Sequence, residues 1–308
     1  MSNISKLIEE RTGYANLLND LDEKLSASEL NSLLLELFRK KAKTLSPTEL
    51  LRQFEKNRFI QPLGIPAIGF KEFELQCMKL AEEYNFNLIT LSPLTCFGTC
   101  SAMAFVDQNN VVTSVRGTEV VSDATNVFAL LMAQTFKKKK TTAPVKYATV
   151  HRHVRSQAFN IPGFTAHFGI LCMATGGPDT GSFAFELDNL TDHINLHVSL
   201  LSKEFDSDKL SMKLFLKGDN EAFRRKLEVT VNALSNPIKT TIERQVNAGD
   251  YYQLVQFKIY LEHDGKEINL SDGGFTDWTQ KLIQNKKHRL LISGAGTELI
   301  YKIKHSYI

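Results

Sequence analysis

The sequence of 308 residues predicts an α+β protein whose strands form a largely antiparallel sheet. Two observations favour this fold class. The clearest strand signal is a hairpin, because residues 251–263 and 266–271 alternate apolar and polar side chains around Asp264-Gly265, a pair favoured in type I′ turns. The remaining β-type segments are joined by hairpins or single helices, without the strict β-α alternation that a parallel sheet requires.

Residues 1–56 are predicted to form an N-terminal helical region. Two helix starts carry a serine followed three residues later by a glutamate, so that the serine accepts from a free backbone amide while the glutamate reaches back. These pairs are Ser26–Glu29 and Ser46–Glu49. The leucines and Phe38 between residues 30 and 38 recur at helical spacing. This apolar stripe is expected to pack either on the rest of the chain or on a protein partner.

Proline and glycine recur between residues 57 and 69, which marks a boundary and predicts a core over residues 57–308. The expected elements of its first half are a helix at 70–86, a short strand at 87–93, a strand pair at 103–117 turning at Asn109-Asn110, a helix at 123–134, and strands at 145–155 and 164–175 around a loop with Pro162 and Gly163. The second half is expected to hold a helix at 188–204, a charged helical stretch, the hairpin, and a helix at 278–285 before residues 289–303.

The charge balance gives no reason to expect a nucleic-acid partner. Lys and Arg number 37 against 34 Asp and Glu, and the net charge is only +3, whereas nucleic-acid-binding domains usually show a strongly basic face. The lysine run 137–140 predicts a solvated loop; contact with phosphate or RNA is the alternative for this run.

Four cysteines are too few for a disulfide framework, so we expect free thiols and a cytoplasmic protein. Neither a signal peptide nor a membrane-spanning segment is predicted. Cys96 and Cys100 could join Cys172, His167 or His193 at a zinc ion, but their spacing lacks the second ligand pair that such sites show. No metal site is therefore predicted.

Residues 150–171, VHRHVRSQAFNIPGFTAHFGIL, resemble the second motif of the class II aminoacyl-tRNA synthetase core, most closely in its histidyl branch. In that family a strand with F-R-x-E is followed by a loop and a returning strand with an aromatic residue. The resemblance places Arg152 on the motif arginine, which binds the α-phosphate of ATP and the amino-acid carbonyl. It places Gln157 on a following glutamine and Phe168 on the ring that stacks on adenine.

Two further stretches are similar to the parts of the histidyl branch that bind the amino acid. Residues 106–126 match its arginine-containing substrate segment, and residues 272–278, DGGFTDW, match its G-G-R-Y-D. The resemblance implies that substrate contacts are made by Arg116, Glu119, Thr125, Gly273, Gly274 and Asp277. Residues 293–300, SGAGTELI, resemble the glycine-rich third motif, which assigns Glu298 to the nucleotide.

Each of these residues also has a purely structural interpretation. The period of two in a strand puts His151 and His153 on one face and Arg152 on the other, where Arg152 could pair with acidic neighbours. Arg116 and Glu119 could form a surface ion pair. Residues 272–277 could be no more than a turn, although adjacent glycines also let a backbone approach a ligand closely.

Two departures from the family bear on catalysis. Val154 stands where the family has the glutamate that reads the adenine amino group, and Leu299 stands where an arginine holds the γ-phosphate. Adenylate formation depends on fixed cations and Mg²⁺ around the phosphates. ATP and Mg²⁺ are therefore implied only if the protein is active, and we expect adenylation to be weakened or absent.

The sequence thus predicts a stand-alone class II synthetase-like core, and we expect no anticodon-reading domain because the chain stops after the third motif. It is expected to bind an amino acid, an adenylate or a related small ligand as a homodimer. The alternative is a regulatory or scaffold subunit resembling that of ATP phosphoribosyltransferase, which would dock a protein partner through its N-terminal helices.

Overall fold

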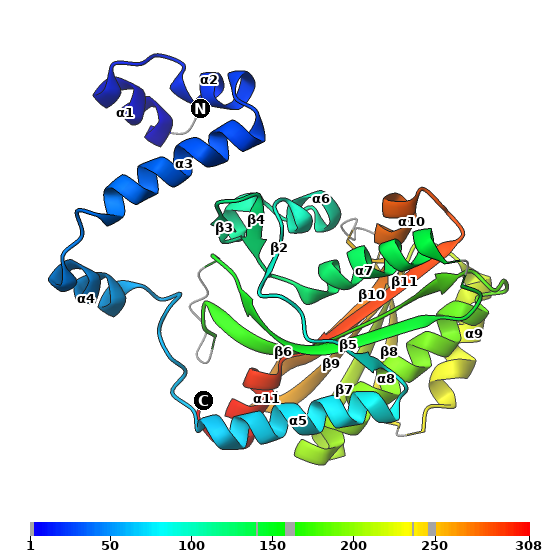
Figure 1. Cartoon of the computed structure of the whole chain (residues 1–308). Helices are drawn as coiled ribbons and strands as arrows, with labels where there is room; N and C mark the ends of the chain where they lie inside the picture. Colours follow the sequence, from blue (N-terminus) through cyan, green and yellow to red (C-terminus); the bar gives the residue numbers. More distant parts are fainter. Residues whose placement is uncertain (1–2, 140, 158–163, 236, 246–250) are drawn as a thin grey trace.

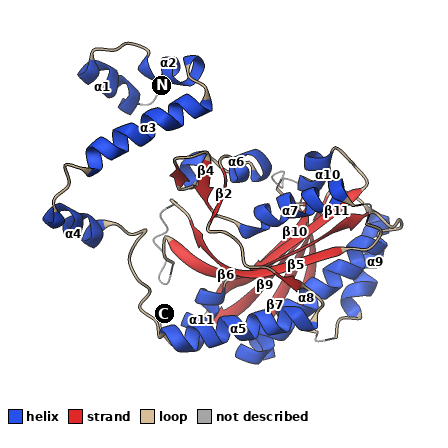
Figure 2. Ribbon diagram, viewed as in Figure 1, coloured by secondary structure: helices blue, strands red, loops and turns tan. Residues whose placement is uncertain are grey.

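The computed structural model describes residues 3–139, 141–157, 164–235, 237–245 and 251–308. Its centre is one large sheet with helices on both faces (Figures 1 and 2). The strands of this sheet are β1 (Asn87–Leu88), β5 (Val145–Val154), β6 (His167–Pro178), β7 (Leu210–Lys217), β8 (Lys239–Gln245), β9 (Gln253–His263), β10 (Lys266–Thr276) and β11 (His288–Ala295). Their spatial order is β1-β5-β6-β11-β10-β9-β7-β8.

The six inner strands of the described sheet run antiparallel to their neighbours, while β1 and β8 pair in parallel at the two edges. The predicted α+β class and antiparallel centre are therefore confirmed, within a mixed sheet. The predicted hairpin is confirmed as β9 and β10. Asp264 and Gly265 both have positive φ, 50° and 71°, as a type I′ turn requires.

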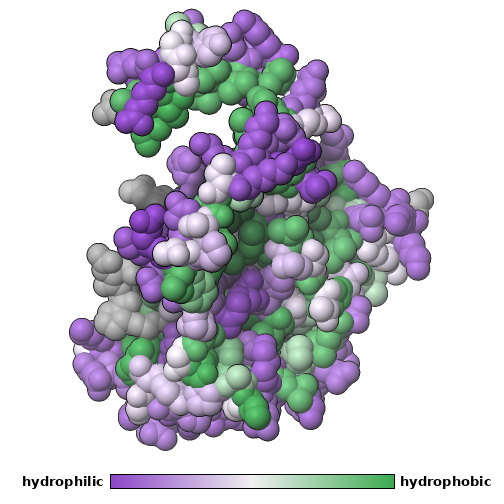
Figure 3. Space-filling view, turned by 60° about the vertical axis from the view of Figure 1, so that its left-hand side comes forward, coloured by the Kyte–Doolittle hydropathy of each residue, from purple (hydrophilic) through white to green (hydrophobic). Residues whose placement is uncertain are grey.

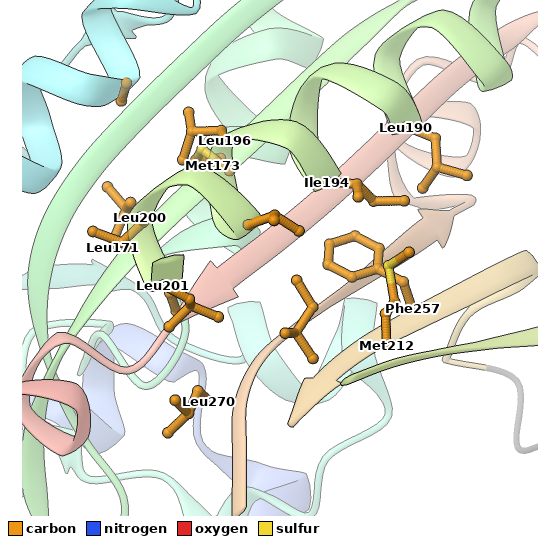
Figure 4. Packing of buried hydrophobic residues seen from close by; sticks show 14 of the residues in the cluster. Leu171, Met173, Leu190, Ile194, Leu196, Leu200, Leu201, Met212, Phe257 and Leu270 are labelled. Carbon is orange, nitrogen blue, oxygen red and sulfur yellow. The ribbon is translucent and has the colours of Figure 1, made fainter. Parts of the chain in front are cut away.

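One face of the sheet is covered by four helices. They are α5 (Ala67–Glu83), α8 (Ala184–Glu204), α9 (Glu221–Asn232) and α11 (Thr297–Lys304). Figure 4 shows how α8 packs: Ile194 lies beside Phe257 of β9, and Leu190, Leu201 and Met212 belong to the same buried cluster. Burying each such side chain contributes about 1.5–3 kcal/mol to folding. This layer forms the main hydrophobic core.

The opposite face is covered by α7 (Ala124–Lys138) and α10 (Trp278–Ile283). Beside them α6 (Thr99–Ala104) packs with a small sheet, ordered β2-β4-β3. Its strands are β2 (Leu94–Cys96), β3 (Thr113–Ser114) and β4 (Thr118–Val120). A second hydrophobic cluster centred on Phe128, Met132 and Trp278 fills the space between these elements and the large sheet.

Four N-terminal helices stand away from the core (Figure 1). They are α1 (Asn3–Thr12), α2 (Leu17–Lys24), α3 (Ala27–Ala42) and α4 (Pro47–Lys56). Both predicted capping boxes, at Ser26 and Ser46, are present. No residue of α2, α3 or α4 is buried. In Figure 3 hydrophobic side chains gather on the side of these helices that faces the core.

Two polar side chains of the N-terminal part, Asn31 in α3 and Arg58 after α4, form hydrogen bonds to the core. The Asn31 Oδ1 accepts hydrogen bonds from the backbone N–H of Arg116 (2.9 Å) and of Gly117 (3.4 Å). The Arg58 guanidinium donates to the carbonyl oxygens of Ser156 and Gln157. The segment after α4 is thus tied to the loop that follows β5.

The structure differs from the sequence prediction over residues 103–117, and in part over the stretch after α8. Residues 103–117 do not form a strand pair turning at Asn109-Asn110. Instead α6 ends at Ala104, and a 3₁₀ helix, η1 (Gln108–Asn110), follows because the Asp107 side chain accepts from the N–H of Asn109. The pairing lies further on, between β3 and β4. Pro162 and Gly163 fall outside the described residues.

The stretch after α8 is not simply helical. A second 3₁₀ helix, η2 (Ser207–Lys209), leads into β7, and α9 then joins β7 to the parallel strand β8. Residues 210–217 alternate buried and half-buried along β7, a period of two that specifies a strand. All four cysteines are free thiols, as expected. No helix among the described residues is both long and apolar enough to span a bilayer.

Candidate functional site

Two cavities adjoin beside the large sheet, the larger of them on the face that carries α7. The larger cavity, about 520 Å³, lies between the start of α7, the segment after α6 and strands β6, β9, β10 and β11. The smaller cavity, about 280 Å³, lies against β6, β10 and the start of α11. Four residues line both: Arg155, Ile170, Asp272 and Gly294. In Figure 3 the surface below the N-terminal helices is hollowed, and both hydrophobic and hydrophilic side chains face the hollow.

Arg155 stands between the two cavities. It follows directly after β5, and its backbone N–H donates to the carbonyl of Ala166 at 2.9 Å, which continues the pairing of β5 with the returning chain. Its Nε donates to the carbonyl of Ser122 at 3.1 Å, and its guanidinium lies 5.2 Å from the centre of the Phe168 ring. These contacts hold the Arg155 guanidinium at the junction of the two cavities, both of which it lines.

A fixed carboxylate, Asp123, lines the larger cavity at the N-terminus of α7. Its Oδ1 accepts from the backbone N–H (2.9 Å) and the hydroxyl (2.7 Å) of Thr125, and its Oδ2 accepts from the Tyr251 hydroxyl at 3.2 Å. Burial acts to raise the pKa of Asp123, but the electrostatic interaction with His153, the charge of Arg155 and the Thr125 hydrogen bonds outweigh it and hold the pKa below its usual value. Asp123 is therefore charged at neutral pH.

A second carboxylate, Asp272, belongs to both cavities. Burial raises the pKa of Asp272 to about 6; Lys258 opposes this shift and the Asp123 charge adds to it. His153 lies near Asp123, and burial lowers its pKa to about 3. The His153 ring is therefore uncharged, and its Nε2 accepts from the N–H of Ala124 at 3.1 Å. The larger cavity thus combines two acidic groups, Asp123 and Asp272, with two basic side chains, Arg155 and Lys217.

Four of the sequence-predicted residues line the cavities. Thr125 and Gln157 line the larger one, and Phe168 and Glu298 line the smaller one. Arg152 lines neither. Its Nη1 contacts the His167 Nδ1 at 2.9 Å and donates to the Glu298 Oε2 at 3.1 Å. The strand alternation explains this placement, because His153 and Arg155 face the cavities and Arg152 points to the opposite face.

Arg116 and Glu119 also lie outside the cavity linings. Arg116 occupies the turn between β3 and β4, with a φ of 77°. Glu119 is buried and accepts hydrogen bonds at the start of α6 from the N–H groups of Gly98 (2.7 Å) and Cys100 (3.1 Å). The Gln108 side chain donates to the same carboxylate at 2.9 Å. Glu119 therefore holds the wall of the larger cavity and does not line it.

The glycine pair serves close packing. A Cβ on Gly273 would lie 2.4 Å from the Cβ of Ser293, and one on Gly274 would lie 2.6 Å from the Tyr252 ring. Both distances are shorter than any side chain tolerates. Asp277 pairs with Lys281 at 2.9 Å at the start of α10. Neither the glycines nor Asp277 line a cavity, so no described contact ties them to a ligand.

The smaller cavity is poorly suited to a magnesium–triphosphate. Both oxygens of Glu298 are already engaged: Oε2 accepts from Arg152, while Oε1 accepts from the Lys302 ammonium at 2.7 Å and from the Thr165 hydroxyl at 3.2 Å. Among the described lining residues of this cavity, Arg155 is the only cation. No group of three or more His, Cys, Asp or Glu residues in the described chain could hold a metal ion.

Sequence reasoning missed three central residues: Arg155, Asp123 and Asp272. The first could have been found, since the alternation that separates Arg152 from the histidines also puts Arg155 on the histidine face. In that register residues 154–157 read V-R-S-Q, which matches F-R-x-E with Gln157 in place of the glutamate. Asp123 showed only as a helix start. Asp272 had no distinguishing sequence signal beyond preceding the glycine pair.

Comparison with known proteins supports the fold. No protein-family model and no curated protein matches the sequence. Among solved structures, an apo histidyl-tRNA synthetase from S. aureus is similar at a TM-score of 0.61 and 14% identity, over 80% of this chain and 70% of that chain. An ATP phosphoribosyltransferase regulatory subunit/histidyl-tRNA synthetase from Bacillus halodurans gives 0.61 and 13%, over 79% and 82%.

A protein assigned as a threonyl-tRNA synthetase from Aeropyrum pernix is also similar, with a TM-score of 0.60 and 13% identity over 78% of this chain and 60% of that chain. The core of the present chain therefore has a class II synthetase-like fold. At these identities the likeness is one of fold alone, and function has to be argued from the two cavities.

Proposed function

We propose that the chain binds an amino acid or a related small ligand in the larger cavity and an adenine nucleotide, or the adenylate that joins both, across the two cavities. The observation that carries this proposal is that the cavities adjoin and share Arg155 and Asp272. A ligand with a carboxylate or phosphate at the junction would meet the Arg155 guanidinium. Its ammonium group would be held by the carboxylates of Asp123 and Asp272.

The smaller cavity supplies apolar surface for a base. Phe164, Phe168 and Leu299 contribute to its lining, and an aromatic face is a common platform for a purine. Arg155 would then contact the α-phosphate, the role that the family resemblance gives to the motif arginine. In this proposal Arg155 takes the place that the sequence assigned to Arg152, and Arg152 supports Glu298 instead.

We further propose that ATP-dependent activation is weak or absent. A triphosphate needs several fixed positive charges, whereas the described lining of the smaller cavity offers Arg155 beside two carboxylates, Asp272 and Glu298. Leu299 adds no charge where the family has an arginine. Pyrophosphate exchange in the presence of ATP, Mg²⁺ and any of the twenty amino acids would contradict this part of the proposal.

The binding proposal is tested by the thermal midpoint of the full chain with AMP, ATP and each amino acid, singly and in pairs. A ligand that binds only the folded state raises Tm by mass action. At one hundred times its Kd it increases the free energy of unfolding by about 2.7 kcal/mol. We expect one amino acid, alone or with AMP, to raise Tm. Failure of every ligand and pair to do so at millimolar concentration would refute the proposal.

A regulatory or scaffold subunit remains the second candidate, and the N-terminal helices favour it. Ile4, Leu18, Phe38 and Leu51 are all more than half exposed, which leaves apolar surface for a protein partner or a second copy of the chain. Co-elution of a stoichiometric enzyme from the source cell would support this function. A solitary homodimer in the cytoplasmic extract would support the ligand-binding protein instead.

A further inference from the structure

A cluster of lysines lies at one end of the core, away from the two cavities of the candidate site. Its members come from two segments nearly 150 positions apart in the sequence: Lys137, Lys138 and Lys139 at the end of α7, and Lys286 and Lys287 between α10 and β11. All five are exposed. The segments meet in space, since the rings of Phe136 and His288 lie 4.7 Å apart. We call these five residues the lysine cluster.

Within the part of the chain that the structure describes, the lysine cluster has no ion-pair partner. Two carboxylates near this surface, Asp179 and Glu186, are both taken by Arg289, at 2.5 and 2.8 Å. The end of α3 is different, because there Arg39 and Lys40 approach Glu36 of the same helix at 3.6 and 3.7 Å. Lysines at a helix end are common because they offset the helix dipole. The lysine cluster differs from such a helix end because Lys286 and Lys287, which also lack an ion pair within the described chain, come from a second segment that lies beside it.

A cavity of about 340 Å³ opens between the two segments. Phe136 and Ile283 give it an apolar and aromatic wall, and the side chains of Lys137 and Lys139 line it as well. The Thr141 Oγ1 and the His288 Nδ1 also belong to lining residues; both atoms are buried and have no hydrogen-bond partner among the described residues. Unpaired buried polar atoms are costly, so a partner from a ligand would satisfy them.

We propose that this surface binds single-stranded nucleic acid, with the phosphates along the lysine cluster and one base in the cavity. The lysines supply point charges for a phosphate backbone. The aromatic and apolar wall supplies a surface for the flat face of a base, and the Thr141 and His288 atoms supply hydrogen bonds to its edge. Lysines beside aromatic side chains are the combination that sequence-tolerant single-strand binding uses. The small net charge of the whole chain does not oppose this, because the charge is concentrated at one site.

Binding of a fluorescein-labelled twelve-nucleotide oligo(U) RNA to the full chain, followed by fluorescence anisotropy over a range of salt concentrations, tests the proposal. We expect the double variant Lys137→Gln/Lys139→Gln to weaken binding by about tenfold and to reduce the salt slope of log K by about 1.4, since each phosphate contact on a single strand contributes about 0.7. The variant Lys286→Gln/Lys287→Gln is expected to act in the same way through the other segment.

The matched control is Lys41→Gln/Lys43→Gln, which removes two exposed lysines from the end of α3 and should leave affinity unchanged. An equal loss in the control and in the cluster variants would overturn the proposal, as would no measurable binding by the wild type. Inorganic polyphosphate with the same number of phosphates is the second probe. If it competes as well as unlabelled oligo(U), the base makes no contribution and the proposed site is refuted; if it competes more weakly, base recognition is supported. The corresponding oligo(dT) distinguishes DNA from RNA as the better ligand.

Discussion

Asp272 is the residue whose chemistry depends most on its surroundings. Its carboxyl lies on the shared wall of the two cavities, with Lys258 on the neighbouring strand and Asp123 and Arg155 across the larger cavity. Burial raises its pKa to about 6, so the folded protein retains a proton that the unfolded chain has lost above about pH 4. Protonation of Asp272 therefore contributes to the free energy of unfolding at low pH, and this contribution is lost as the pH rises through 6.

This linkage gives a prediction for Asp272→Asn, which keeps the shape of the side chain and removes its titration. The free energy of unfolding of the wild type, relative to the variant, should fall between pH 4 and pH 7, by at most about 3 kcal/mol. Urea unfolding of both proteins at several pH values measures the difference. A constant difference, or one that grows with pH, would show that Asp272 does not have a raised pKa.

At the scale of single elements, β5 determines which side chains reach the site. Its alternation places Arg155 toward the cavities and Arg152 toward Glu298, and the Ser122 carbonyl and Phe168 ring then fix the Arg155 guanidinium. The short helix α6 depends on one buried carboxylate in the same way. Glu119 receives three N–H groups from outside its own strand, and these bonds hold the cavity wall in place.

Glu119→Gln separates a structural from a ligand-binding role for this residue. A glutamine cannot accept all three of these hydrogen bonds, so we expect the free energy of unfolding to drop by about 1–3 kcal/mol. Glu262→Gln, on the exposed end of β9, is the control and should have little effect. Unchanged stability of Glu119→Gln together with lost ligand affinity would instead place Glu119 in contact with the ligand.

For the whole molecule, most elements of the fold could be predicted from local patterns in the sequence. The hairpin, the capping boxes, α5, α8 and the β5–β6 pair all have local signals, because propensity, capping and turn chemistry act within a few residues. The region from 99 to 120 did not follow its local pattern. There the partners of Glu119, the N–H groups of Gly98 and Cys100, are set by tertiary structure.

The site was less predictable than the fold, and Arg152 and Arg155 show why. They are three residues apart, Arg152 within β5 and Arg155 directly after it, and the face of the sheet to which each side chain points distinguishes them. Asp272 and Asp123 come from opposite ends of the core sequence, so their proximity depends on the strand order of the sheet. A motif can be matched along the chain, whereas the members of a pocket are selected by topology.

Calorimetric titration of AMP into the wild type, Arg155→Gln and Arg152→Gln tests whether Arg155 binds the nucleotide. If Arg155 lies at the junction of a nucleotide and an amino-acid subsite, its loss removes a charged hydrogen bond and should weaken AMP binding by about tenfold or more. Arg152→Gln should change the affinity by less than about threefold, within the range of an indirect effect. No binding of AMP to the wild type, or a loss confined to Arg152→Gln, would contradict a nucleotide site at Arg155.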